Sequence, residues 1–145
     1  MPWIKVWLHF VWSTKDRHPF LTDDIRQKVF THIRENARAK GIFIDFINGY
    51  LEHVHCLISL GSDQSIETIM QLIKGESSHW INKNGLTRMK FGWQDEYFVT
   101  AVAESALPSV RRYIANQEEH HKKVSFDEEF NEFLSRAGFE KRPDL

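Results

Sequence analysis

Cysteine is almost absent from this 145-residue chain, which has Cys56 alone. A single thiol excludes an intrachain disulfide and a cysteine-rich zinc site. No apolar run approaches the roughly 20 residues that a membrane-spanning helix requires, and the first residues lack the basic, apolar and small order of a signal peptide. The sequence therefore predicts a single domain over residues 1–145 that stays in the cytoplasm and has no membrane partner.

Strong net charge is also absent, because 19 basic residues balance 20 acidic ones. The charges are nevertheless uneven: residues 1–40 carry four more basic than acidic residues, whereas an acidic C-terminal segment covers about 126–145. Separate basic segments can converge on one face and contact phosphates. Solvated helix faces produce the same pattern, so charge alone leaves nucleic-acid binding open.

Apolar periodicity predicts four strands and three main helices. Alternation at residues 3–12 indicates the first strand, and the others are expected at 42–50, 53–61 and 97–102. Helices are expected at about 25–40, capped by Thr22-Asp23-Asp24, at about 66–81, capped by Ser65, and from Pro108 to about 121. A short last helix is expected around 127–136. This order predicts an α+β fold, a ferredoxin-like β-α-β-β-α-β antiparallel sheet with helices on one face, plus C-terminal helices.

The third strand contains His53-Val54-His55. Side chains alternate along a strand, so both imidazoles leave one face while Val54 and Cys56 enter the core. Two histidines so placed on the face that the helices leave open can bind one divalent cation. His9 of the first strand is placed to share that surface. A pair of half-buried histidines satisfied by hydrogen bonds is the competing interpretation.

The third helix carries Tyr113 and Gln117 on one face, since they are four residues apart. A phenol is a poor nucleophile unless a cation or base assists it, and a metal at the histidine pair would assist it by polarising a phosphate. The Gln117 amide oxygen is placed to complete the ligand set. Nitrogen and oxygen ligands without thiolate favour Mg²⁺ or Mn²⁺ once phosphate and water fill the other positions. Tyrosines at helical spacing are also ordinary core residues.

Over roughly residues 5–125 the chain resembles the tyrosine transposases of the IS200/IS605 group, in the HUH (His, hydrophobic, His) endonuclease superfamily. The resemblance rests on four segments in this order: His9–Arg17, Glu52–Ile58, Trp93–Val99 and Val110–Gln117. Cys56 and Glu52 differ mildly from the family pattern, but neither position is an expected metal ligand. The resemblance implies that His53, His55 and Gln117 bind the metal and that Tyr113 is the nucleophile, on one of the C-terminal helices.

The same resemblance implies a DNA transposase of a bacterial or archaeal cell. It would cleave single-stranded DNA at hairpin-bearing ends through a 5′-phosphotyrosine intermediate, as a homodimer whose tyrosine acts in its own subunit or in the partner. His120, near Tyr113 by helix geometry, would assist proton transfer. The basic residues expected to contact phosphates are Lys15, Arg17, Lys74, Arg88, Arg111 and Arg112.

Other functions remain open at this level. A domesticated relative that processes repeated chromosomal hairpins would use the same chemistry. A non-catalytic module binding single strands on an aromatic sheet face is a different class, but the aromatic strand motif of RNA-binding sheets is missing. A two-histidine phosphodiesterase would require two His-x-Ser/Thr motifs, which are not evident.

Overall fold

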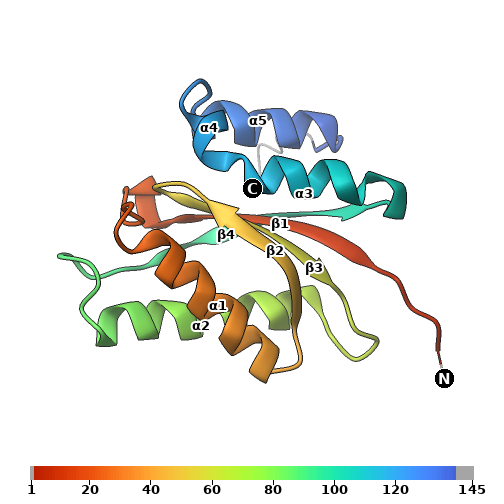
Figure 1. The fold of residues 1–145 in the computed structure, drawn as a ribbon, viewed down its shortest axis with the longest axis horizontal. Helices are drawn as coiled ribbons and strands as arrows, with labels where there is room; N and C mark the ends of the chain where they lie inside the picture. The colour runs from red at the N-terminus through yellow and green to blue at the C-terminus, as the bar shows by residue number, and fades with distance from the viewer. Residues whose placement is uncertain (1, 140–145) are drawn as a thin grey trace.

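The computed structural model describes residues 2–139, in which four strands form one antiparallel sheet in the order β2-β3-β1-β4 (Figure 1). The predicted central position of the first and third strands is confirmed, with Phe10 of β1 opposite Cys56 of β3. The strands are β1 (Trp7–Thr14), β2 (Phe43–Gly49), β3 (His53–Ser59) and β4 (Trp93–Val102). The predicted α+β class is therefore confirmed, as is the strand order.

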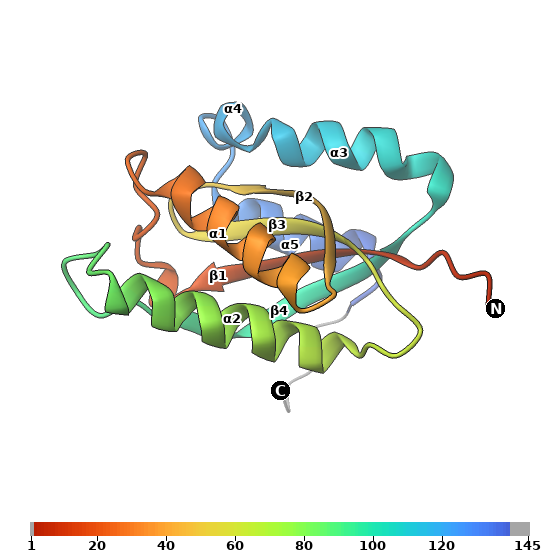
Figure 2. The ribbon, with the colours of Figure 1, turned by 60° about the horizontal axis from the view of Figure 1, so that its bottom comes forward.

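Helices cover both faces of the sheet. α1 (Arg26–Ala39) and α2 (Ile66–Lys83) lie on one face, and α3 (Leu107–Ala115), α4 (Gln117–His121) and α5 (Phe126–Arg136) lie on the other (Figures 1 and 2). Two short 3₁₀ turns follow β1 and β4, at Lys15–Arg17 and Glu104–Ala106. The expectation that the second face stays open was wrong, because the C-terminal helices close it.

The main core lies between the sheet and helices α1 and α2. Alternate residues of β1 enter this layer, as the first-strand pattern predicts, and β3 contributes its own alternate residues. On the helix side, apolar residues at three- and four-residue spacing complete the layer. The fully buried members include Phe10, Trp12, Val54, Cys56, Ile58, Val29, Ile69 and Ile81.

Apolar side chains on the second face explain why it is covered. Val11 and Phe98 are buried beneath Phe126 of α5, and Leu57 packs against Ile114 of α3. Left in water, these side chains would forfeit the free energy gained when apolar surface is buried. The sheet is therefore the middle of three layers, and both histidines of β3 lie inside the molecule.

Several element boundaries differ from prediction, among them those of β1, which spans Trp7–Thr14 and not 3–12. The helix expected from Pro108 to 121 breaks at Asn116, which has φ −97° and ψ 20° and begins a new, short helix; asparagine favours such breaks because its side chain competes for backbone hydrogen bonds. β4 begins at Trp93, four residues earlier than expected. α1 begins at Arg26 without the predicted side-chain cap, whereas Ser65 accepts from the Thr68 amide as predicted.

Within the residues that the structure describes, no helix is both long and apolar enough to cross a membrane. The predicted acidic C-terminal segment begins with α5, but its last part, 140–145, lies outside the described residues.

Two glycines provide a matched test of the fold. A Cβ on Gly49 would lie 2.1 Å from the carbonyl oxygen of His53, whereas one on Gly75 in α2 meets nothing within 4 Å. We expect Gly49→Ala to lower the free energy of unfolding by about 1–3 kcal/mol through steric strain. Gly75→Ala should raise it by about 0.5–1 kcal/mol, because alanine favours a helix. Urea unfolding measures both, and equal effects would contradict the close packing beside His53.

Candidate active site

Strands β1 and β3 bring three histidines together on the face away from the main core. His53 and His55 project from the same face of β3, as the alternation predicts. Both are fully buried, although that face was expected to be open. His9 lies beside them, with its Nε2 2.9 Å from Nδ1 of His55. The two histidines therefore lie side by side on one face of the sheet, as predicted, and His9 contacts His55 directly.

Helices α3 and α4 place Tyr113 and Gln117 over these histidines. The ring centroid of Tyr113 lies 5.6 Å from that of His55, and the Gln117 Oε1 lies 2.9 Å from the His53 Nε2. Asn48 on β2 holds the end of α3 by donating to the carbonyl of Ile114. All four residues predicted for the metal and the nucleophile therefore lie together in one chain.

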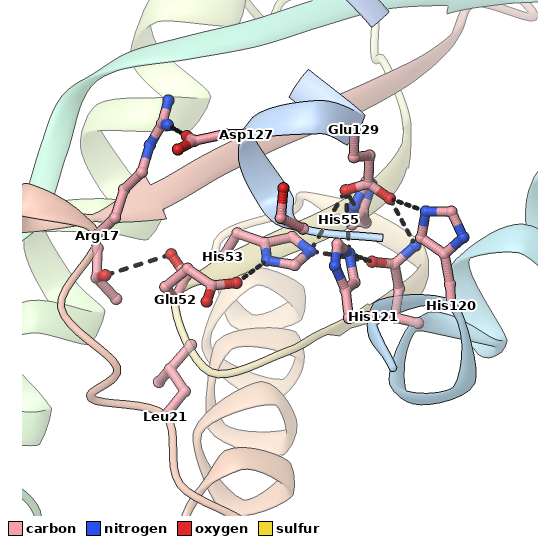
Figure 3. Close-up of polar contacts among 12 residues, drawn as sticks. Arg17, Leu21, Glu52, His53, His55, His120, His121, Asp127 and Glu129 are labelled. Carbon is pink, nitrogen blue, oxygen red and sulfur yellow. Dashed lines mark hydrogen bonds and ion pairs between the residues drawn. The ribbon is translucent and has the colours of Figure 1, made fainter. Parts of the chain in front are cut away.

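Glu129 of α5 occupies the middle of this group, and the sequence analysis did not identify it. Its Oε1 lies 3.0 Å from the His55 Nε2, and its Oε2 lies 3.0 Å from the His120 Nε2 (Figure 3). The Tyr113 hydroxyl donates a hydrogen bond to the same carboxylate. Although it is an acid, Glu129 lies on the apolar stripe of α5, three residues after Phe126. This spacing is the feature of the sequence that marks Glu129 as facing inward.

Burial and the Glu129 carboxylate control the protonation of the group. Burial raises the pKa of the Tyr113 phenol, and the neighbouring carboxylate raises it further. Burial also lowers the pKa of His55 to about 3 and that of His9 to about 4. Burial opposes ionisation of Glu129, but the neighbouring imidazoles of His121 and His55 outweigh it and lower the pKa of this carboxyl. The site thus holds a protonated phenol beside an ionised carboxylate.

His121 of α4 is a second residue beyond the predicted set. Its Nε2 lies 3.0 Å from the Gln117 Oε1 and 3.3 Å from the Glu129 Oε1. One donor atom from each of His53, His55, His121 and Glu129 lies within 4.8 Å of the others. Imidazoles and a carboxylate are ligands for divalent metals, so this group has the composition of a metal site.

The two predicted accessory residues, His9 and His120, also lie at this group of side chains. His120 contacts the Tyr113 hydroxyl at 3.4 Å, as the helical spacing predicts despite the break at Asn116.

The basic residues predicted to contact phosphates are spread over the surface. Arg17 pairs with Asp127 of α5 and lies over the rings of two of its phenylalanines. Arg111 pairs with Asp45, and Lys74 donates to backbone carbonyls of β4. The other three, Lys15, Arg88 and Arg112, are exposed.

A family model and a relative of known name both relate this chain to transposases. The model of the family described as "Transposase IS200 like" matches residues 3–117. The ISDra2 transposase TnpA of Deinococcus radiodurans is 25% identical over 114 residues, which are 75% of this chain and 81% of that protein.

Two solved structures share the fold. A crystal structure of a Deinococcus radiodurans transposase has a TM-score of 0.65 at 23% identity, over 80% of this chain and 93% of that one. A REP-associated tyrosine transposase bound to a REP hairpin has a TM-score of 0.64 at 20% identity, over 86% of this chain and 73% of that one.

Glu52 provides a test of the histidine geometry. Its carboxylate accepts from the His53 Nδ1 at 2.7 Å, which leaves Nε2 free to bind a metal. We expect Glu52→Ala to weaken Mn²⁺ binding about tenfold or more, because the ring loses its orienting partner. Isothermal titration calorimetry measures the affinity, with Glu67→Ala on α2 as control. Unchanged affinity in Glu52→Ala would show that this contact does not prepare His53 for a metal.

Proposed function

This chain belongs to the family of IS200-like transposases, and on that premise we propose that it cleaves and rejoins single-stranded DNA at hairpin-bearing ends. The proposed nucleophile is Tyr113, and the proposed metal ligands include His53, His55 and Gln117. The proximity of the Tyr113 phenol to the buried histidine pair of the same chain carries this proposal. A nucleophile and a metal site that act on one phosphate have to lie close together, and this proximity supports the proposal.

In the proposed reaction, the Tyr113 oxygen attacks the phosphorus of a phosphodiester. A bond forms between this oxygen and phosphorus, and the bond from phosphorus to the 3′ oxygen breaks. The products are a 5′-phosphotyrosine and a free 3′-hydroxyl. Attack by a 3′-hydroxyl on the phosphotyrosine then reforms a phosphodiester and releases Tyr113. One phosphoester bond replaces another at each step, so no nucleotide cofactor is consumed.

His120 is placed to accept the phenol proton, because its Nε2 lies 3.4 Å from the Tyr113 hydroxyl. Glu129 accepts a hydrogen bond from the same hydroxyl, but its lowered pKa makes it the weaker acceptor. A bound Mg²⁺ or Mn²⁺ would polarise the phosphate and stabilise the negative charge that develops on its oxygens. Gln117 positions His53 through their contact, and the covering helices keep bulk water away from the histidines.

A non-catalytic module that stacks bases on the sheet is less compatible with this arrangement. The face that would offer aromatic side chains is covered by α3, α4 and α5 (Figure 2), and Trp93 is buried in the main core.

We also propose a homodimer, because each chain has one tyrosine of this kind and transposition requires two DNA ends. Light scattering after gel filtration would report its mass.

Tyr113→Phe tests the covalent step. We expect wild-type protein, incubated with a labelled single-stranded hairpin and Mn²⁺, to give a protein–DNA adduct in denaturing gels. Tyr113→Phe should give none, because it lacks the attacking oxygen. Tyr97→Phe is the matched control, since Tyr97 lies on the surface of β4, and it should retain the adduct. An adduct of undiminished yield in Tyr113→Phe would refute the assignment of the nucleophile.

Arg88 and Lys15 test the DNA contacts. Arg88 lines an open groove of about 560 Å³ between the segment after β1 and the loop after α2, and Lys15 is exposed in the first of these segments. We expect Arg88→Ala and Lys15→Ala to weaken hairpin binding and each to reduce the slope of log affinity against log salt by about 0.7.

Fluorescence anisotropy at several salt concentrations measures this slope. The control is Lys40→Ala, which removes an exposed charge just after the far end of α1. An unchanged slope in both Arg88→Ala and Lys15→Ala would place the DNA elsewhere.

A further inference from the structure

The C-terminal segment contributes two donor groups to the histidine pair that lie beyond the family match at residues 3–117. His121 comes from α4 and Glu129 from α5, and both side chains are only 2% exposed. Figure 3 shows them converging on His53 and His55. Burying a carboxylate on an otherwise apolar helix stripe is costly unless positive charge compensates it. The position of Glu129 therefore calls for a cationic partner.

Hydrogen bonds on the outer side of the rings orient the histidines. His53 Nδ1 donates to the Glu52 carboxylate, and His121 Nδ1 donates to the Val124 carbonyl at 2.8 Å. In neutral rings, these bonds leave the lone pairs of both Nε2 atoms pointing inward. His55 likewise turns Nδ1 toward His9 and Nε2 inward. Three imidazole Nε2 atoms thus face one centre, each backed by a polar partner as metal-binding histidines usually are.

The three inward-facing Nε2 atoms lie opposite an oxygen of the Glu129 carboxylate, which has no hydrogen to donate. The Nε2 of His53 lies 3.5 Å from the Glu129 Oε1, that of His55 3.0 Å and that of His121 3.3 Å. Lone pairs facing one another at such distances repel unless a second proton or a cation lies among them. Ligand atoms bonded to one metal at about 2.1 Å lie about 3.0–3.4 Å apart, which is close to these three separations from the Glu129 Oε1.

We propose that His121 and Glu129 are ligands of the cation that His53 and His55 bind. The same ion would then act in the proposed active site and hold α5 in place over Tyr113. This inference rests on the metal-dependent function proposed above and extends its ligand set into α4 and α5. Three imidazoles, one carboxylate and the proposed Gln117 amide oxygen form a nitrogen-rich set. Such a set prefers later first-row metals such as Co²⁺ and Zn²⁺ to Mg²⁺, which favours oxygen ligands.

Glu129→Gln is the decisive variant, since it keeps the shape of the side chain and removes its charge. Glu132→Gln is the matched control, because Glu132 lies one turn further along α5 with its side chain 54% exposed. We expect Glu129→Gln to raise the dissociation constant of Co²⁺ about tenfold or more in titration calorimetry. The visible absorption of bound Co²⁺ should weaken or shift in this variant, whereas Glu132→Gln should match the wild type in both measurements.

Hydrogen exchange tests the fastening of α5 without relying on activity. Adding Co²⁺ should slow exchange of the α5 amides in wild type and Glu132→Gln, because the bound ion links this helix to the sheet. Glu129→Gln should lose most of this protection. Circular dichroism checks that the variant is folded, and if it is not, His121→Gln takes its place with the same expected losses.

The outcomes separate this inference from the proposed function. Equal Co²⁺ affinity and equal α5 protection in wild type and Glu129→Gln would overturn the inference, even if the Tyr113 adduct forms. The absence of cation binding in wild type would also overturn it, and would indicate that the rings hold second protons instead. Failure of the adduct with intact cation binding would count against the proposed function alone.

Discussion

The alternation of side chains along β3 is the constraint on which the rest of the structure depends. Val54, Cys56 and Ile58 enter the main core, so His53 and His55 must leave the opposite face. A shift of one residue in the pairing with β1 would reverse both sets and expose the core. The apolar residues of β3 therefore hold the histidines in place, and the free energy of core burial also maintains the geometry of the site.

Closure of the second face turns these histidines from surface groups into buried ones. The phenylalanines of α5 pack on β1 and β4, and α3 packs on Leu57. Apolar burial thus positions the helices, while their few inward polar side chains meet β3. The same packing brings Tyr113, Gln117, His121 and Glu129 to one place although they belong to three helices. A site assembled in this way depends on the C-terminal helices as much as on the sheet.

Much of this arrangement follows from sequence patterns, and some does not. The period-two pattern around His53 predicted the faces of β3 because a core strand tolerates one register. The spacing of Tyr113 and Gln117 predicted their shared face, although the break at Asn116 was missed because one residue of low helix propensity does not by itself end a helix. Glu129 was missed because the acids around it indicate a solvated helix, and only its spacing from Phe126 marks it as inward. Which helix covers which face depends on tertiary packing that no local pattern encodes.

The protonation of Tyr113 explains why the proposed nucleophile and the proposed metal ligands share one cluster. Ionising a phenol of ordinary pKa near 10 at pH 7 costs about 4 kcal/mol. Burial and the Glu129 charge raise the pKa of Tyr113, so the cost here is larger. A divalent cation among the histidines would oppose both effects, because it neutralises Glu129 and favours the phenolate. The carboxylate that raises the pKa of Tyr113 is therefore also a group through which a bound cation would lower it.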